Sequence, residues 1–111
     1  MPTIFEPKDL PVTEKNGAKI ATLANSALLG TDALQVESII LSAGAQSGSF
    51  EASNAERFAY VIHGNGQAHV GEQELLLDTE SVLWLEKSDS FYLKAGAEGL
   101  EVLLCHAPAG G

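Results

Sequence analysis

The feature that most constrains the fold of this sequence is a series of short apolar segments, separated by glycine, aspartate, serine and asparagine residues. No stretch with helical periodicity extends beyond roughly a dozen residues. Short strands at regular spacing, with turn residues between them, are typical of a β-sandwich or a small barrel. The sequence therefore predicts an all-β fold. The expected strands are 34–42, 58–63, 67–70, 74–77, 82–85, 90–93 and 100–106.

Turn and breaker residues divide the rest of the chain. Prolines at positions 2, 7 and 11 predict an extended leader, because proline fixes φ and lacks a backbone donor. Asn16-Gly17 predicts a tight hairpin turn. The segment Ala18 to Leu29 fits a strand followed by one helical turn, and its pattern does not decide the matter. Gly64-Asn65-Gly66 is expected to break a strand after His63.

Charge limits the class of partner. Fifteen acidic and six basic residues give this chain of 111 residues a formal charge of −9. Binding to nucleic acids or anionic membranes depends on neutralising negative charge, so neither is expected as a partner. The length fits one domain. No apolar run approaches the roughly 20 residues that span a bilayer, and Met1 to Leu10 lacks the layout of a signal peptide. We therefore expect a cytoplasmic protein.

The single cysteine, Cys105, excludes an internal disulfide and leaves no CxxC motif for a structural zinc site. It lies in a strongly apolar run, which favours a buried, unreactive thiol over a nucleophile. Two runs, Leu75 to Leu77 and Leu100 to Leu104, are apolar on both faces of their expected strands. Such strands need cover from another sheet or another subunit.

Two stretches resemble the conserved motifs of the cupin family. The run Gly44 to Leu77 is similar to the first motif, in which a loop leads to a His-x-His pair, a glutamate and an aromatic strand with a glycine-broken hairpin. The run Glu80 to Leu104 is similar to the second motif. The resemblance implies an antiparallel double-stranded β-helix, or jelly-roll barrel, over residues 34–108. Residues 1–33 would be an arm and the first strands of the same domain, and residues 109–111 a tail. Since cupins are commonly dimeric, a homodimer is expected.

The same resemblance puts the metal-ligand positions of the family on other residue types. The two histidine positions of the first motif fall on Phe50 and Ala52, or on Glu51 and Ser53 if the loop shifts by one residue. Phe91 stands at the histidine position of the second motif. The resemblance therefore implies a barrel that has lost its metal ligands, and we expect neither a metal nor another cofactor.

Arg57, the only arginine, stands at the glutamate position of the first motif, seven residues before Gly64. Its planar guanidinium carries a permanent charge and five donors. Three interpretations are open: an internal ion pair with Glu51 or Glu56, a site for a small anionic ligand, or a solvated residue at the rim.

The histidines offer no clear alternative metal site. His63 and His69 lie six residues apart along one expected stretch of strand, which is roughly 20 Å if extended. An imidazole nitrogen must lie about 2.0–2.1 Å from zinc, so they share a metal only if the glycine break folds the chain back. His106 is remote in sequence and close to the C-terminal end. Surface or hydrogen-bonded histidines are expected.

Aromatic residues would line a pocket around Arg57: Phe50, Phe91, Trp84 and Tyr60 or Tyr92. Packing in the core is the competing interpretation, and it is the one expected for Trp84 and Phe58.

The leading hypothesis is a metal-free, cupin-like barrel that binds a small, anionic or carbonyl-bearing molecule in its mouth. Its ligand-binding residues would be Phe50, Glu51, Ser53, Arg57 and Phe91. One alternative is a metal-independent isomerase, with Glu51, Glu56, His63 or a tyrosine as the base. The other is a structural or regulatory dimer module without a ligand.

Overall fold

The computed structural model describes residues 12–15, 18–24, 35–53 and 55–107. This part of the chain contains seven β-strands and no helix. The strands are β1 (Val12–Lys15), β2 (Ala18–Ala24), β3 (Gln35–Leu41), β4 (Glu56–Val70), β5 (Gln73–Leu77), β6 (Val82–Leu85) and β7 (Phe91–Ala107). Within these residues there is accordingly no helix long and apolar enough to cross a membrane. The predicted all-β fold is confirmed.

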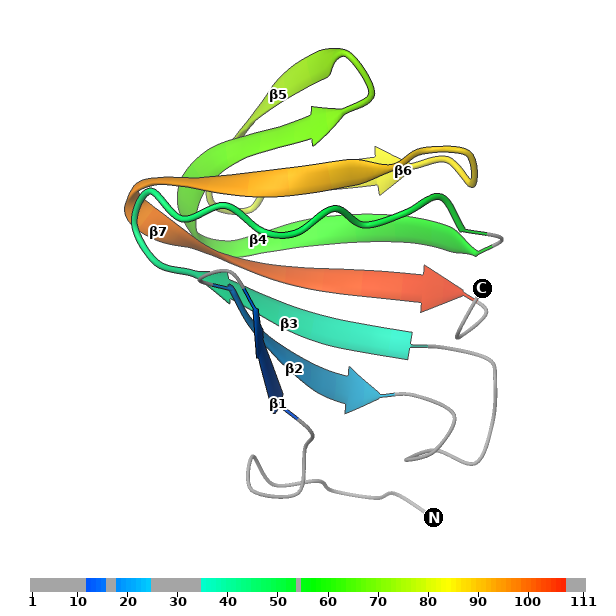
Figure 1. Ribbon diagram of the computed structural model, residues 1–111, viewed down its shortest axis with the longest axis horizontal. Coiled ribbons are helices and arrows are strands. Elements are labelled where there is room, and N and C mark those ends of the chain that lie inside the picture. The colour runs from blue at the N-terminus through cyan, green and yellow to red at the C-terminus, as the bar shows by residue number, and fades with distance from the viewer. Residues whose placement is uncertain (1–11, 16–17, 25–34, 54, 108–111) are drawn as a thin grey trace.

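One continuous antiparallel sheet is folded into two layers by its two long strands. Its order is β1-β2-β3-β7-β4-β5, and β6 also pairs with β4. The first half of β4 lies between β6 and the second half of β7, whereas its second half lies between β5 and the first half of β7. In Figure 1 both long strands turn back at the left of the view, so the layers join there. This is a jelly-roll arrangement.

The long strands differ from the prediction. The sequence predicts separate strands at 58–63 and 67–70, and again at 90–93 and 100–106, but β4 and β7 are each continuous. Register shifts lie between Val61 and His63 and between Gly64 and Gly66. Hydrogen bonding resumes beyond each shift, so the glycines bend the strand rather than end it. The predicted strand break was therefore wrong.

Several predictions fall outside the described residues. These are the proline-rich leader, the Asn16-Gly17 turn, the helical turn before Leu29 and the tail 109–111. On either side of residues 16–17, Lys15 of β1 pairs with Ala18 of the antiparallel strand β2.

A single apolar core fills the space between the layers. Alternate residues of each strand face inward, as the period of two requires, and each buried aliphatic or aromatic side chain contributes about 1.5–3 kcal/mol. The buried apolar residues are Ala18, Ile39, Leu41, Ala59, Val61, Ala68, Leu77, Leu83, Leu85, Phe91, Leu93, Ala95, Leu100, Val102 and Leu104.

Two aromatic residues expected in the core lie on its outside. Trp84 is 60% exposed and Phe58 is 37% exposed. Both alternate with buried neighbours, since Leu83 and Leu85 flank Trp84, and Arg57 and Ala59 flank Phe58. Small and aliphatic side chains therefore occupy the inward positions, and the core-packing prediction for Trp84 and Phe58 was wrong.

The bend of β4 generates a testable prediction. Gly64 has φ of 91°, and a Cβ there would overlap the carbonyl oxygen of Gly99. Gly71 also has a positive φ, of 58°, but a Cβ there would meet nothing within 4 Å. Denaturant unfolding should show that Gly64→Ala lowers the free energy of unfolding by about 3 kcal/mol, from strain and overpacking together. The control Gly71→Ala should cost only about 1 kcal/mol, from strain alone. Equal losses would contradict this account of the bend.

Candidate functional site

The barrel mouth, meaning the end of the two layers where β4 begins and where β7 both begins and ends, holds the predicted site. The segment before β4 is tied to β7 by an isolated bridge. The amide of Phe50 donates to the carbonyl of Phe91 at 2.7 Å, and the amide of Phe91 donates back at 2.9 Å. The two rings stack with centroids 4.8 Å apart and planes 15° apart. The structure thus puts Phe50, rather than Glu51, opposite Phe91.

Arg57 is the second residue of β4 and points into the barrel. Ala59 and Val61, at the next alternate positions of the strand, face inward as well. Arg57 is only 2% exposed. One terminal nitrogen, Nη1, donates to the carbonyl of Glu51 at 2.9 Å, and Nη2 donates to the carbonyl of Asp89. Its Cζ lies 5.4 Å from the centroid of the Phe91 ring, within cation–π range. The interpretation of Arg57 as a solvated rim residue was therefore wrong.

Instead of the internal ion pair with Glu51 or Glu56, which was one of the three interpretations, Arg57 forms hydrogen bonds to the main chain. Glu51 offers its carbonyl, and its side chain is exposed. Glu56 is exposed at the neighbouring position of the strand, facing away from the mouth. Arg57 therefore ties two loops to β4 through carbonyl oxygens, which accept from a cation without adding a buried carboxylate.

Burial lowers the pKa of the Arg57 guanidinium from its ordinary value, while the nearby Asp89 carboxylate acts in the opposite direction. An arginine stays protonated at physiological pH. The mouth therefore holds a permanent positive charge, which is partly compensated by carbonyl dipoles and by the face of the Phe91 ring.

One hydrogen-bonding nitrogen of Arg57 has no partner. Its Nε is buried and makes no hydrogen bond among the described residues. Leaving a charged donor unpaired costs more than leaving a neutral one, because its desolvation is not offset. This atom marks a position where an oxygen acceptor would be stabilised.

His106, which is remote from Arg57 in sequence, lies beside it in the structure. The two residues are Cα partners on adjacent strands β7 and β4. The Nε2 of His106 is buried and lies 3.2 Å from Oε1 of Glu37 on β3, within ion-pair distance. The side chains of His106 and Glu37 are 14% and 18% exposed. The mouth thus contains a close imidazole–carboxylate pair that the sequence prediction missed.

A sequence signal for His106 did exist. Leu100, Val102 and Leu104 face inward at alternate positions, so the same period puts His106 on the inner face. The pattern within β7 did not show which strand lies beside it. The pairing of β7 with β4, which brings His106 next to Arg57, could therefore not be predicted.

The five predicted ligand-binding residues fall into two groups. Phe50, Arg57 and Phe91 meet at the mouth, and Glu51 joins them through its carbonyl. Ser53 serves the loop instead, since its Oγ accepts from the amide of Ala55 at 3.0 Å and its own amide donates to the carbonyl of Lys87 at 2.9 Å.

The aromatic lining is narrower than expected. Tyr60 shares the outer face of β4 with Phe58, and its Cα partner on β6 is Val82. Tyr92 lies between the buried residues Phe91 and Leu93 of β7, so its side chain points to the opposite face. There its ring stacks on His69, with centroids 4.4 Å apart. Of the aromatic candidates, Phe50 and Phe91 alone line the mouth within the described part of the chain.

These residues do not fit a divalent metal. Phe50 and Phe91 offer no ligand atom to a metal. Arg57, at the glutamate position of the family, is itself a cation. Elsewhere in the described ranges, no group of three or more His, Cys, Asp or Glu side chains could hold a metal ion. The guanidinium at one of the family's ligand positions is suited to an oxygen acceptor, not to a cation.

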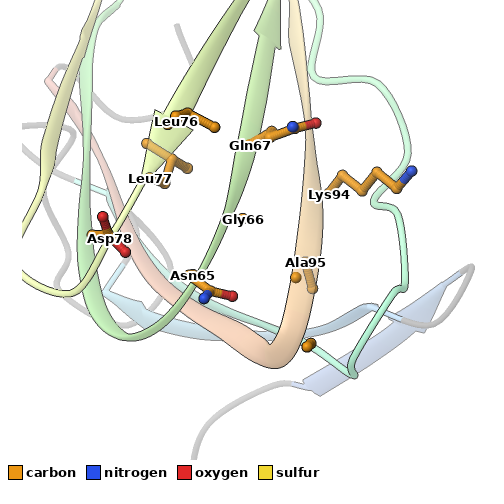
Figure 2. A pocket seen from close by; sticks show the side chains of 10 residues that line it. Asn65, Gly66, Gln67, Leu76, Leu77, Asp78, Lys94 and Ala95 are labelled. Atoms are coloured by element: carbon orange, nitrogen blue, oxygen red, sulfur yellow. The ribbon is translucent and has the colours of Figure 1, made fainter.

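A separate cleft of about 440 Å³ lies away from the mouth, between β4, β5 and β7. Figure 2 shows Gly66 at its centre, with Asn65 and Asp78 on one side and Gln67 and Lys94 on another. Its size is within the usual range for small-molecule pockets. None of the predicted ligand-binding residues lines it.

Cys105 is half-buried on the outer face of β7. Burial raises the pKa of its thiol, so the thiol stays protonated at neutral pH and is a poor nucleophile. This agrees with the expectation of an unreactive cysteine.

Solved structures share this fold. No protein-family model and no curated protein matches the sequence. A predicted oxalate decarboxylase from Thermotoga maritima superposes with a TM-score of 0.80 and 13% identity, covering 96% of this chain and 99% of the other. An RmlC-like cupin from Shewanella frigidimarina gives a TM-score of 0.78 and 15% identity, covering 99% and 94%. The Streptomyces nucleoside dehydratase Pac13 gives 0.81 and 13% identity, covering 100% and 86%.

Removing the Arg57 cation should destabilise the fold. Arg57→Met leaves the carbonyls of Glu51 and Asp89 without their donor, and charge-assisted hydrogen bonds are worth about 1.5–3 kcal/mol each. Denaturant unfolding should therefore show a loss of about 2–4 kcal/mol. The control is Lys87→Met, which removes an exposed cation from the neighbouring loop and should change the stability by less than about 0.5 kcal/mol. Similar losses in both variants would contradict the bracing role of Arg57.

Proposed function

Since the chain has the cupin fold, as its sequence resemblance implied, we propose that it binds a small anionic or carbonyl-bearing molecule at the barrel mouth, without a divalent metal. The observation that carries the proposal is the buried Nε of Arg57, which has no hydrogen-bond partner, beside the buried imidazole of His106 on the adjacent strand at the same mouth. A carboxylate, phosphate or carbonyl oxygen supplies the acceptor that the guanidinium lacks.

Access to this pair is from the side of β3 and β7. Phe91 and the two loops cover Arg57, whereas the His106 and Glu37 side chains remain partly exposed. The ligand would therefore approach past His106 and meet the guanidinium at its Nε edge. The carboxylate of Glu37 limits the negative charge that the ligand can carry, because a second negative charge bound beside it is repelled. A monoanion or a neutral carbonyl compound fits best.

The structural module without a ligand is the second candidate. The stacked rings of Phe50 and Phe91, with Arg57 bonded to loop carbonyls, close the part of the mouth where the family would bind its metal. This closure favours a purely stabilising role for Arg57. The isomerase alternative is weaker, because two of its candidate bases, Glu56 and His63, are exposed and lie outside the mouth.

Ligand binding can be tested by thermal shift and isothermal titration calorimetry with formate, acetate, malonate and inorganic phosphate. The wild type should be stabilised by at least one monocarboxylate. Arg57→Lys keeps the charge but loses the Nε donor, and His106→Gln removes the imidazole. Each should weaken binding about tenfold or more, because one charge-assisted bond is lost.

Two control variants locate the site. Lys94→Gln removes the cation of the separate cleft, and His63→Gln removes an exposed imidazole from the same strand as Arg57. Both should bind as the wild type does. Binding that is lost in Lys94→Gln and kept in His106→Gln would move the site to the cleft and overturn the proposal. Absence of any response in the wild type would also overturn it, in favour of the structural module.

A further inference from the structure

The separate cleft between β4, β5 and β7 is not used by a ligand at the mouth, and it carries charges of both signs. Asp78, directly after β5, lies on one side of it, and Lys94 of β7 lies on the other (Figure 2). Because β4 separates β5 from β7, the two walls are about two strand spacings apart, roughly 10 Å. The cleft therefore offers an anion on one wall and a cation on the other.

Both charged groups are available to a ligand. Among the described residues, neither the carboxylate of Asp78 nor the ammonium of Lys94 forms an ion pair or a hydrogen bond. The main chain of Asp78 is held in a turn, because its amide donates to Oγ of Ser81 at 3.0 Å and its carbonyl accepts from the amide of Ser81 at 2.9 Å. The carboxylate thus starts from a fixed position, whereas the ammonium of Lys94 is carried on a flexible stem.

Two glycines leave the floor between these walls bare. A Cβ on Gly66 would overlap the carbonyl oxygen of Lys94, so glycine lets β4 and β7 approach closely there. A Cβ on Gly96 would overlap Oδ1 of Asn65, so this amide takes the place of a side chain. Oδ1 of Asn65 is buried and has no hydrogen-bond partner within the described ranges. An acceptor in this state is stabilised by a donor such as an ammonium group.

Apolar surface lies on the same walls as the charges. Leu76, two residues before Asp78, lines the cleft and is 80% exposed. Ala97 is exposed on the side of β7. Covering exposed aliphatic surface with methylene groups is favourable in proportion to the area removed from water. The lining therefore suits an aliphatic segment between two charged ends.

We propose that the separate cleft binds a zwitterion in which an aliphatic segment separates an ammonium from a carboxylate, as in ω-amino acids. The ammonium pairs with Asp78, the carboxylate pairs with Lys94, and the methylenes cover Leu76. A ligand with a single charge would meet one group of like sign, whereas a zwitterion meets an opposite charge at each end. Its net charge of zero also avoids repulsion by a chain with a formal charge of −9.

The test is an NMR titration of the ¹⁵N-labelled full chain, followed at the side-chain amides of Asn65 and Gln67, which both line the cleft. We expect 6-aminohexanoate to shift these signals saturably. Glycine should bind at least about tenfold more weakly, because its charges cannot reach both walls and it has no segment to cover Leu76. Hexanoate and hexylamine, which each keep one charge, should also bind at least about tenfold more weakly at these signals.

Charge variants identify the walls. Asp78→Asn and Lys94→Gln should each weaken 6-aminohexanoate binding about tenfold or more, because one charge-assisted contact is lost. The matched controls Glu74→Gln and Lys87→Gln remove exposed charges of the same signs outside the lining and should bind as the wild type does. The double variant Asp78→Lys with Lys94→Asp should bind at least about threefold more tightly than either single variant, since the zwitterion then binds in the reverse direction.

The proposal is overturned if the wild type does not respond to 6-aminohexanoate, or if hexanoate or hexylamine binds at these signals as tightly. Binding that Asp78→Asn and Lys94→Gln leave intact, or that the double variant does not improve over the single ones, would also overturn it. The ligand comparison needs no variant that could misfold. His106→Gln should leave the titration unchanged, and a loss confined to this variant would move the zwitterion to the mouth. Failure of monocarboxylates to bind at the mouth does not alter any of these results.

Discussion

The arrangement at the barrel mouth depends on the guanidinium of Arg57. It joins the start of β4 to the carbonyls of two loops and lies over the ring of Phe91, which stacks in turn on Phe50. In the cupin resemblance these three residues stand at metal-ligand positions. The chain therefore keeps a positive charge at the position of the metal, and its bonds to carbonyl oxygens stabilise the mouth without a carboxylate partner.

Two features of the mouth have opposite consequences for binding. The stacked rings of Phe50 and Phe91 favour a closed, rigid mouth, whereas the buried Nε of Arg57, which has no hydrogen-bond partner, favours an oxygen-bearing ligand.

The sequence predicted the fold class, because short strands and the turn residues between them are local features. For Arg57, the cupin resemblance gave the position, and three interpretations stayed open. The prediction failed where pairing between distant strands decides the outcome. The sequence did not bring His106 to the site, and it lies beside Arg57 because β7 pairs with β4 from Glu56 to Val70. The expectation that Trp84 lies in the core failed for another reason. The hydrophobicity of a side chain does not tell which face of its strand is buried, and Trp84 lies on the outer face. The sequence predicts strand ends where β4 and β7 bend, since a glycine fits the end of a strand as well as a bend within one.

The central claim is that a guanidinium replaces the metal at the barrel mouth. The most direct measurement is elemental analysis by mass spectrometry of protein purified from metal-supplemented medium without chelators. The account predicts zinc, iron, nickel and manganese far below one atom per chain. A stoichiometric amount of any of them, lost together with stability on dialysis against a chelator, would contradict it.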